Sequence, residues 1–211
     1  MEPKGILEKN MKRYDIINWF IQEYGYKIYL EIGLDQPKNC FDLIQCEEKF
    51  SIDPKTGSGK SHFRMTSDAF FSENKMFFDI VFVDGMHLAD YACNDIKNSL
   101  KSLHDNGTII IHDCNPQNEI EASPNRTTRR WNGNVWQAFA YFRATRKDLL
   151  MYTVDADEGC GIIRNGCQDL YTGRYDNYAD LAENRDEILK LISPEFMKSA
   201  FTNNHKTQRV Y

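Results

Sequence analysis

The segment FDIVFVDG, residues 78–85, places a short apolar run directly before an aspartate and a glycine. Two other segments repeat the pattern, IYLEIG at residues 28–33 and TIIIHD at residues 108–113. Runs this short, apolar and β-branched are typical of strands buried on both faces of a sheet. In an open α/β sheet the ligand site lies outside the carboxyl ends of the strands, so we expect the three endings to converge. The residues expected at that site are Glu31, Gly33, Asp84, His112 and Asp113.

The composition is that of an ordinary globular protein of 211 residues, with 41% hydrophobic and 27% charged residues. Its formal net charge of -5 argues against a protein that binds nucleic acid, because such proteins usually present a basic face. No apolar stretch approaches the ~20 residues of a membrane span, and residues 1–5 lack the apolar core of a signal peptide. We therefore expect a cytoplasmic protein with no nucleic-acid or membrane partner.

Apolar spacing and turn residues predict helices that alternate with strands along the chain. The expected helices cover residues 10–24, 39–48, 69–74, 87–103, 135–143 and 184–191. The expected strands cover residues 28–32, 49–52, 62–65, 79–83, 108–111, 149–154 and 160–164, with a turn at 105–107 and a long loop at 115–130. In the helix over 87–103, the residues expected to face inward are Tyr91, Ile96, Leu100 and Leu103. This alternation implies right-handed crossovers and a largely parallel sheet.

The stretch TGSGKS, residues 56–61, looks like a phosphate-binding loop, but its surroundings argue against one. The motif requires a glycine where Pro54 stands, and a helix that starts at the lysine. Proline has no amide hydrogen to offer a phosphate, and the residues after Ser61 are strand-like. We interpret this stretch as a surface loop.

An acid follows the second strand at the place where nucleotide-binding sheets hold a ribose. Asp53 lies about twenty residues after Gly33, which is the separation expected of such an acid. The glycine fingerprint that cradles a pyrophosphate is absent, since the residues after Gly33 are LDQP. A cofactor with a ribose and an adenine but no phosphate fits better than a dinucleotide. S-adenosylmethionine is such a cofactor.

Several motifs in order resemble those of class I S-adenosylmethionine-dependent methyltransferases. They are YLEIG at 29–33, IDP at 52–54, TSDAFF at 66–71, DIVFVDGMH at 79–87 and HDCNP at 112–116. The chain looks most like the small-molecule and sugar O-methyltransferase-like branch. The resemblance covers nearly the whole chain and implies a Rossmann-like α/β fold, with a doubly wound, mostly parallel seven-stranded sheet and helices on both faces.

The resemblance also implies roles in cofactor binding. Glu31 and Gly33 match the first motif, in which the acid and the backbone hold the methionine part of the cofactor. Asp53 matches the acid that binds the ribose. Asp68 matches the acid near the adenine amino group, with Ser67 beside it. Asp84, at the end of the fourth expected strand, would lie between the cofactor and the substrate.

Metal-dependent relatives hold magnesium with the acid that matches Asp84 and with an acidic pair that follows the fifth expected strand. Here that pair is His112-Asp113, so the resemblance implies Asp84 and Asp113 as the remaining metal ligands. Because a histidine replaces one of the acids, whether the site binds magnesium is left open. Some relatives carry another acid at the position of Met86. In its absence His87 or His112 is the candidate general base, because imidazole titrates near neutral pH. His87, His112 and Asp113 are thus the candidate catalytic residues.

We expect one methyltransferase-like domain over residues 1–211, with an N-terminal helix in 1–26, a cofactor-binding core in 27–165 and a C-terminal helical extension in 166–211. The expected reaction is O-methylation of a small hydroxylated acceptor such as a sugar or glycoconjugate. Arginines in the 115–130 loop could bind a carboxylate or phosphate on it. The alternatives are an oxidoreductase or a metal-dependent hydroxylase-like enzyme on the same scaffold, and a non-catalytic cofactor-binding protein. Assembly into a homo-oligomer is left open.

Overall fold

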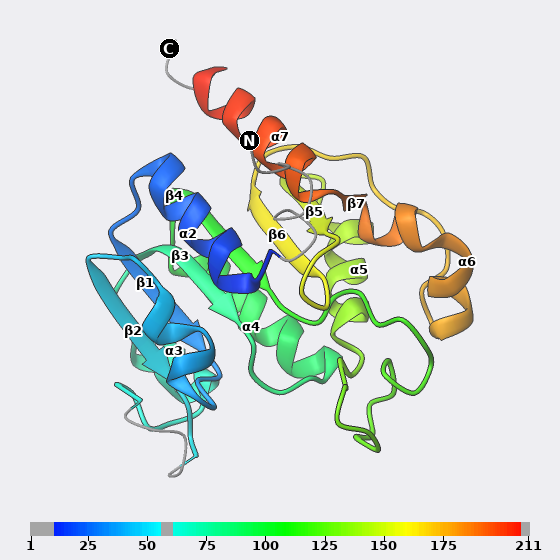
Figure 1. Cartoon of the computed structure of the whole chain (residues 1–211), viewed down its shortest axis with the longest axis horizontal. Coiled ribbons are helices and arrows are strands. Elements are labelled where there is room, and N and C mark those ends of the chain that lie inside the picture. Colours follow the sequence, from blue (N-terminus) through cyan, green and yellow to red (C-terminus); the bar gives the residue numbers. More distant parts are fainter. Residues whose placement is uncertain (1–10, 56–60, 208–211) are drawn as a thin grey trace, which may run out of the picture.

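The computed structural model describes residues 11–55 and 61–207, and its centre is a seven-stranded sheet with the order β2-β1-β3-β4-β6-β5-β7 (Figure 1). The strands are β1 (Ile28–Ile32), β2 (Glu48–Ile52), β3 (Phe78–Val83), β4 (Leu103–Ile111), β5 (Leu149–Val154), β6 (Cys160–Asn165) and β7 (Leu191–Ile192). β1 pairs in parallel with β2 and β3, as do β3 with β4 and β5 with β7. Of the seven strands within the described residues, only β6 runs antiparallel to its neighbours, β4 and β5. The predicted doubly wound, mostly parallel sheet is confirmed.

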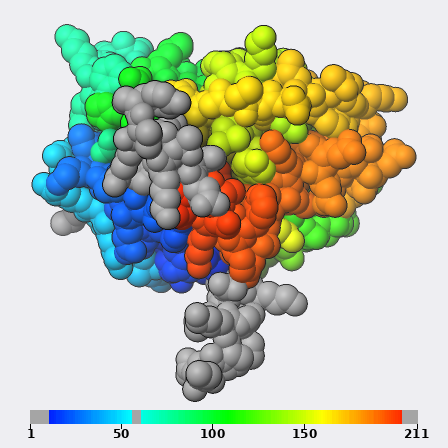
Figure 2. All heavy atoms as spheres, turned by 90° about the horizontal axis from the view of Figure 1, so that it is seen from above, coloured from blue at the N-terminus to red at the C-terminus, as the bar shows by residue number. Residues whose placement is uncertain are grey.

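Helices cover both faces of the sheet (Figure 1). The helices are α2 (Arg13–Tyr24), α3 (Ser67–Glu73), α4 (Ala89–Lys101), α5 (Val135–Thr145), α6 (Tyr178–Leu189) and α7 (Pro194–Thr207), with two 3-10 turns, η1 (Pro37–Asn39) and η2 (Phe41–Leu43). Helices α2 and α7 share one face, and α3 to α6 pack on the other. Figure 2 shows α2 in blue beside α7 in red.

The apolar runs of the central strands supply two separate cores. In β3, Val81 and Val83 pack on the side of α3 to α6, whereas Ile80 and Phe82 pack on the side of α2 and α7. Successive side chains of a strand point to opposite faces, so a strand covered on both faces needs apolar residues at every position. This is why the segments quoted first in the sequence lack any alternation with polar residues.

Two predicted elements before α3 are wrong. Residues 39–48 form no α-helix, and only the two 3-10 turns stand in their vicinity. The Lys49 ammonium donates to the carbonyls of Phe41 and Ile44 at 2.9 and 3.1 Å, so these carbonyls are satisfied without a helix. The predicted strand at 62–65 is reduced to a single bridge between Ile52 and Phe63. Residues 56–60 of the glycine-rich loop lie outside the described residues.

Two details around α4 also differ from the prediction. Residues 105–107 belong to β4 rather than to a turn. The pairing of β3 with β4 shifts between Phe78–Leu103 and Ile80–Thr108, so these residues form a β-bulge within the strand. Tyr91 is 52% exposed instead of facing inward. Asp95 and Ser99 take part in the buried face of α4, so this face is less apolar than the spacing predicts.

The C-terminal part contains more structure than predicted. Helix α6 begins at Tyr178, where Asn177 and Asp180 form a capping box, and α7 is an additional helix. The sequence carries a signal for α7, since Ser193 precedes Pro194 and the Ser193 hydroxyl accepts a hydrogen bond from the Phe196 amide at 3.2 Å. Among the described residues, no helix has the length and apolar character to cross a membrane.

Replacing Phe201 by alanine should destabilise the protein by about 3–5 kcal/mol, because it would leave a cavity under α7. The Phe201 ring is fully buried and lies 5.2 Å from the Phe20 ring of α2 and 5.9 Å from the Tyr152 ring of β5. Phe196 on the same helix is 53% exposed, so Phe196→Ala is the matched control and should change stability by less than about 0.5 kcal/mol. Urea unfolding measures both, and equal losses would contradict this packing.

Candidate functional site

The carboxyl ends of β1, β2, β3 and β4 open into one cleft of about 620 Å³, a size usual for small-molecule sites. It lies where the strand order reverses, because β2 is on one side of β1 and β3 is on the other. All nine residues singled out from the sequence line it: Glu31, Gly33, Asp53, Ser67, Asp68, Asp84, His87, His112 and Asp113. The prediction that the strand endings converge is therefore confirmed, and their chemical roles stay predictions.

Gly33 allows β1 and β3 to approach each other at the cleft. Its φ is +90°, and a β carbon there would lie 2.2 Å from the backbone oxygen of Asp84. Any side chain would therefore push the ends of the two strands apart. The position requires glycine for close approach as well as for its conformation.

Asp53 organises the loop that follows β1. Its carboxylate accepts hydrogen bonds from the amides of Leu34 and Asp35 at 3.0 and 3.3 Å, and from the amide of Lys55 at 2.7 Å. The side chain therefore fixes the loops after β1 and β2 against each other. Each carboxylate oxygen has further acceptor capacity, so Asp53 can also face a ligand in the cleft.

Glu31 is a buried acid at the inner end of the cleft. It is 2% exposed and accepts a hydrogen bond from the Tyr29 hydroxyl at 2.5 Å. Burial raises the pKa of Glu31 to about 8, because a charge is costly where water is excluded. The group is thus largely protonated at neutral pH in the ligand-free protein, and a cation placed beside it would favour its ionised form.

A second acidic group lies at the start of α3. Ser67 is half-buried and Asp68 is exposed, and both line the cleft. Asp95 of α4 joins them, 4% exposed, and burial raises its pKa to about 6. The sequence analysis missed Asp95 because the residue sits inside an amphipathic helix pattern. The sequence feature that could have identified Asp95 is its place on the expected inward face of the helix, one position before Ile96.

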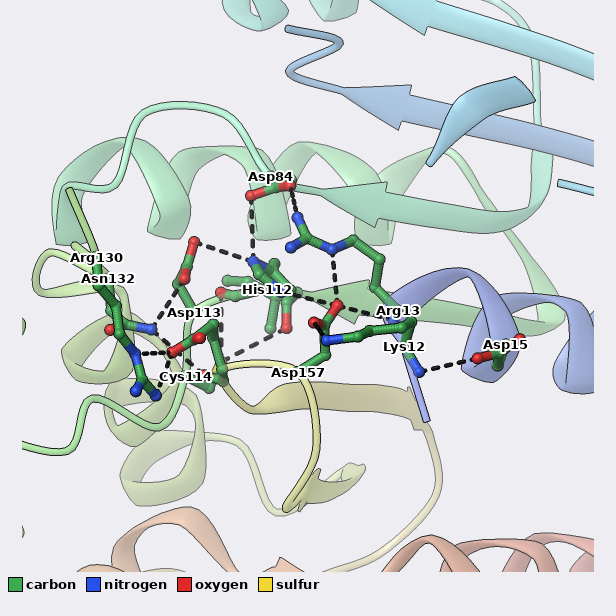
Figure 3. Close-up of polar contacts among 12 residues, drawn as sticks. Lys12, Arg13, Asp15, Asp84, His112, Asp113, Cys114, Arg130, Asn132 and Asp157 are labelled. Carbon is green, nitrogen blue, oxygen red and sulfur yellow. Dashed lines mark hydrogen bonds and ion pairs between the residues drawn. The ribbon is translucent and has the colours of Figure 1, made fainter. Parts of the chain in front are cut away.

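Three carboxylates surround the buried imidazole of His112 (Figure 3). Its Nδ1 lies 3.1 Å from Asp113 and 3.5 Å from Asp84, and its Nε2 lies 3.6 Å from Asp157. Burial alone would lower the pKa of His112, but Asp113 and Asp84 raise it well above its usual range. The imidazole therefore keeps its proton and acts as a resident cation.

Arg13 is a second resident cation, and it comes from the N-terminal helix (Figure 3). Its Nη1 lies 2.7 Å from Asp84, and its Nε donates to Asp157 at 2.9 Å. Lys12 adds an ion pair with Asp157 at 3.1 Å. The neighbouring cations His112 and Arg13 outweigh the effect of burial and hold the pKa values of Asp84 and Asp157 below their usual range. We call Arg13, Asp84, His112, Asp113 and Asp157 the ion network.

The ion network contains two members that the sequence analysis missed, Arg13 and Asp157. Arg13 lies on a helix whose apolar spacing was noted, but nothing local aims it at the strand ends. Asp157 lies in the turn between β5 and β6, where it has a φ of +44° and Glu158 one of +69°. Asp113 also has a positive φ, of +62°. Non-glycine residues rarely adopt this conformation, and it concentrates at functional sites.

His87 lies at the edge of the ion network and packs against Trp131. The two rings stack with centroids 4.9 Å apart and planes 10° apart. The His87 Nδ1 lies 2.9 Å from the Trp131 carbonyl and 3.2 Å from Asp113, both of which are acceptors. These contacts favour the proton on Nδ1, which leaves the lone pair of a neutral ring on Nε2. The Nε2 lies 3.7 Å from Asp84.

The predicted long loop at 115–130 is confirmed, and its contacts fix it over the cleft. The Arg130 guanidinium lies 2.7 Å from Glu158, and the Trp131 indole donates to the Ser123 carbonyl at 2.6 Å. Asn132, fully buried, donates to Asp113 at 2.9 Å. Arg126, Arg129 and Arg130 line the cleft from this loop.

One set of side chains has the spacing of metal ligands. Asp84, His87 and Asp113 can each direct one ligand atom to within 4.8 Å of the others. Two of the three carry other partners, since Arg13 takes one oxygen of Asp84 and Asn132 takes one oxygen of Asp113. The remaining oxygens of both acids face the Nδ1 of His112. Magnesium prefers a shell of free oxygen ligands. Because Arg13 and His112 lie against these acids, the set does not fit a magnesium ion.

Comparisons with known proteins agree with this architecture. A family described as a methyltransferase domain matches residues 41–114. No curated protein matches the sequence. Among solved structures, an O-methyltransferase from Bacillus cereus in complex with S-adenosylhomocysteine shares 13% identity, with a TM-score of 0.51 over 74% of this chain and 81% of that one.

Two further structures show the same likeness. A methyltransferase from Podospora anserina with bound S-adenosylhomocysteine shares 17% identity, with a TM-score of 0.51 over 77% of this chain and 82% of that one. An O-methyltransferase of tomaymycin synthesis from Streptomyces achromogenes, in complex with S-adenosylmethionine, shares 12% identity, with a TM-score of 0.51 over 71% of this chain and 78% of that one. At identities this low, the structural likeness establishes the fold alone. The chain is thus similar to a methyltransferase domain over residues 41–114, and it shares the fold of these S-adenosylmethionine- and S-adenosylhomocysteine-bound methyltransferases.

Proposed function

We propose that this enzyme transfers the methyl group of S-adenosylmethionine to a hydroxyl oxygen of a small acceptor such as a sugar or glycoconjugate. The observation that carries the proposal is the convergence of all nine expected site residues on one cleft at the reversal of the strand order. The matched methyltransferase domain favours this chemistry over the oxidoreductase and hydroxylase alternatives. A single domain over residues 1–211 and a cytoplasmic location stay predictions, and assembly into a homo-oligomer stays open.

The acidic inner part of the cleft suits the cofactor, which carries a sulfonium and an ammonium group. Glu31 and the backbone at Gly33 would hold its methionine part, and Asp53 would bind the ribose hydroxyls. Ser67 and Asp68 would lie at the adenine, with Asp95 beside them. The acids supply hydrogen-bond acceptors along the whole length of the ligand.

His87 is the general base of the proposed mechanism. When bound, the cofactor supplies a methyl group that its sulfonium activates, so the enzyme has to align the acceptor and remove one proton. The Nε2 of His87 carries the free lone pair and borders the ion network, and it would take the proton of the acceptor hydroxyl as the new O–C bond forms. His112 is held protonated by its carboxylate neighbours, so it would position Asp84 and Asp113 instead.

We further propose that the reaction proceeds without magnesium. In a metal-dependent site a divalent cation would neutralise Asp84 and Asp113, the two ligands that the sequence predicts. Here Arg13 lies against Asp84, and the imidazole of His112 lies within 3.5 Å of both acids. An added divalent cation would have to displace or repel these groups. The two resident cations would therefore stabilise the acids in its place.

Replacing Asp53 by alanine should weaken S-adenosylhomocysteine binding at least tenfold, or about 1.4 kcal/mol, because the ribose loses its acceptor. Isothermal titration calorimetry measures the affinity. Asp105→Ala is the matched control, because Asp105 is an exposed acid on β4. Asp53 also fixes two loops, so a thermal unfolding curve must show that the variant is folded. Unchanged affinity in folded Asp53→Ala would remove Asp53 from the cofactor site.

Cofactor binding should release a proton at Glu31. In the ligand-free protein its pKa is about 8, so at pH 7 most molecules carry the neutral acid. An ammonium group beside it requires the ionised form, so affinity should rise with pH between about 6 and 7.5, by at most tenfold per unit. Above that range the cofactor's own amino group loses its proton, near 7.7–8.0.

Calorimetry in two buffers of different ionisation enthalpy detects the released proton. Glu31→Gln keeps the shape of the side chain and removes the titration, so its affinity should be nearly independent of pH over the same range. A pH dependence that persists unchanged in Glu31→Gln would show that another group is responsible.

A further inference from the structure

The cleft is divided by charge. Its inner part, at the strand ends, carries the acids Glu31, Asp53, Asp84 and Asp113. Its outer edge carries three arginines from the loop over the cleft, Arg126, Arg129 and Arg130. The chain as a whole has a net charge of -5, so this local excess of positive charge runs against the overall balance. Such an arrangement attracts an anionic group to one end of the site.

The three arginines differ in how they are used. Arg130 is committed to the fold, since its guanidinium lies 2.7 Å from Glu158 and 3.6 Å from Glu121. Arg126 and Arg129 are exposed, and within residues 11–55 and 61–207 neither forms an ion pair. Two guanidinium groups therefore face the cleft with their hydrogen-bond donors available to a ligand.

Arg126 is held at a defined place relative to the proposed base. Its guanidinium lies over the Trp131 ring, 5.8 Å from the ring centroid, and Trp131 in turn stacks on His87. Arg126 and His87 thus both pack against the Trp131 indole. A ligand that binds Arg126 would therefore lie close to the indole that stacks on His87.

We propose that the acceptor carries an anionic group, a carboxylate or a phosphate monoester, and that Arg126 and Arg129 bind it while the acceptor hydroxyl lies at His87. This inference rests on the proposed function and adds the substrate class. The planar guanidinium forms paired hydrogen bonds with either anion, so both arginines suit this role. They also offset the repulsion that the acidic inner part of the cleft would exert on such an acceptor.

Matched neutral and anionic probes test the proposal. The pairs are glucose with glucuronate and with glucose 6-phosphate, and 3,4-dihydroxybenzyl alcohol with 3,4-dihydroxybenzoate. With saturating S-adenosylmethionine, formation of S-adenosylhomocysteine gives kcat/KM for each probe. Saturation-transfer NMR on the protein loaded with S-adenosylhomocysteine gives binding independently of turnover. At least one anionic probe should bind or react at least tenfold better than its neutral partner.

The double variant Arg126→Ala/Arg129→Ala should remove most of that preference. Its affinity for S-adenosylhomocysteine should be unchanged, and the wild-type preference should fall with added salt. Arg174→Ala is the matched control, because Arg174 is 75% exposed and lies outside this cleft. Thermal unfolding checks that all variants fold.

Each contrary result has a distinct meaning. Equal use of neutral and anionic probes, or no binding by any anionic probe, would overturn the proposal. A tenfold loss of S-adenosylhomocysteine affinity in the double variant would also overturn it, since the arginines would then hold the cofactor's own carboxylate. Failure of the wild-type protein to bind S-adenosylhomocysteine would instead reject the proposed function itself.

Discussion

The ion network is the interaction on which the candidate site depends. Asp84, Asp113 and Asp157 come from three different parts of the chain, and their mutual repulsion would separate them if nothing neutralised it. His112 lies among all three, and Arg13 bridges Asp84 and Asp157 at 2.7 and 2.9 Å. The same contacts tie helix α2 and the turn between β5 and β6 to the ends of β3 and β4. A resident pair of cations thus serves both folding and the shape of the cleft.

This arrangement supports the proposal that one cleft serves two ligands of different charge. Strand ends that converge at the reversal of the strand order bring Glu31, Asp53 and Asp84 to its inner part, where a cationic cofactor is favoured. The loop after β4 carries the arginines and Trp131, so the opposite charge lies on the side that we propose for the acceptor. Methyl transfer needs alignment and the loss of one proton, and His87 lies between the two regions.

Most of the sheet could be predicted from the sequence, and so could the site residues that lie at the ends of the strands. A strand buried on both faces has a recognisable apolar run, and its last residues are fixed to the sheet edge, so Asp84 and His112 could be placed in advance. Arg13, Asp95 and Asp157 could not, because each reaches the cleft through the packing of a helix or a turn. The false helix at 39–48 has a similar cause: Lys49 satisfies carbonyls of this segment from outside it. Helix α7 was predictable from Ser193 and Pro194, and was missed.

Metal binding tests the central claim most directly, because it requires no knowledge of the acceptor. Mn²⁺ can be titrated into the protein loaded with S-adenosylhomocysteine and followed by electron paramagnetic resonance, with Mg²⁺ as a competitor. If Arg13 and His112 take the place of a divalent cation, free Mn²⁺ should appear from the first addition, with no saturable site up to millimolar concentration. One saturable equivalent of Mn²⁺, displaced by Mg²⁺ and lost in Asp113→Asn, would contradict the account.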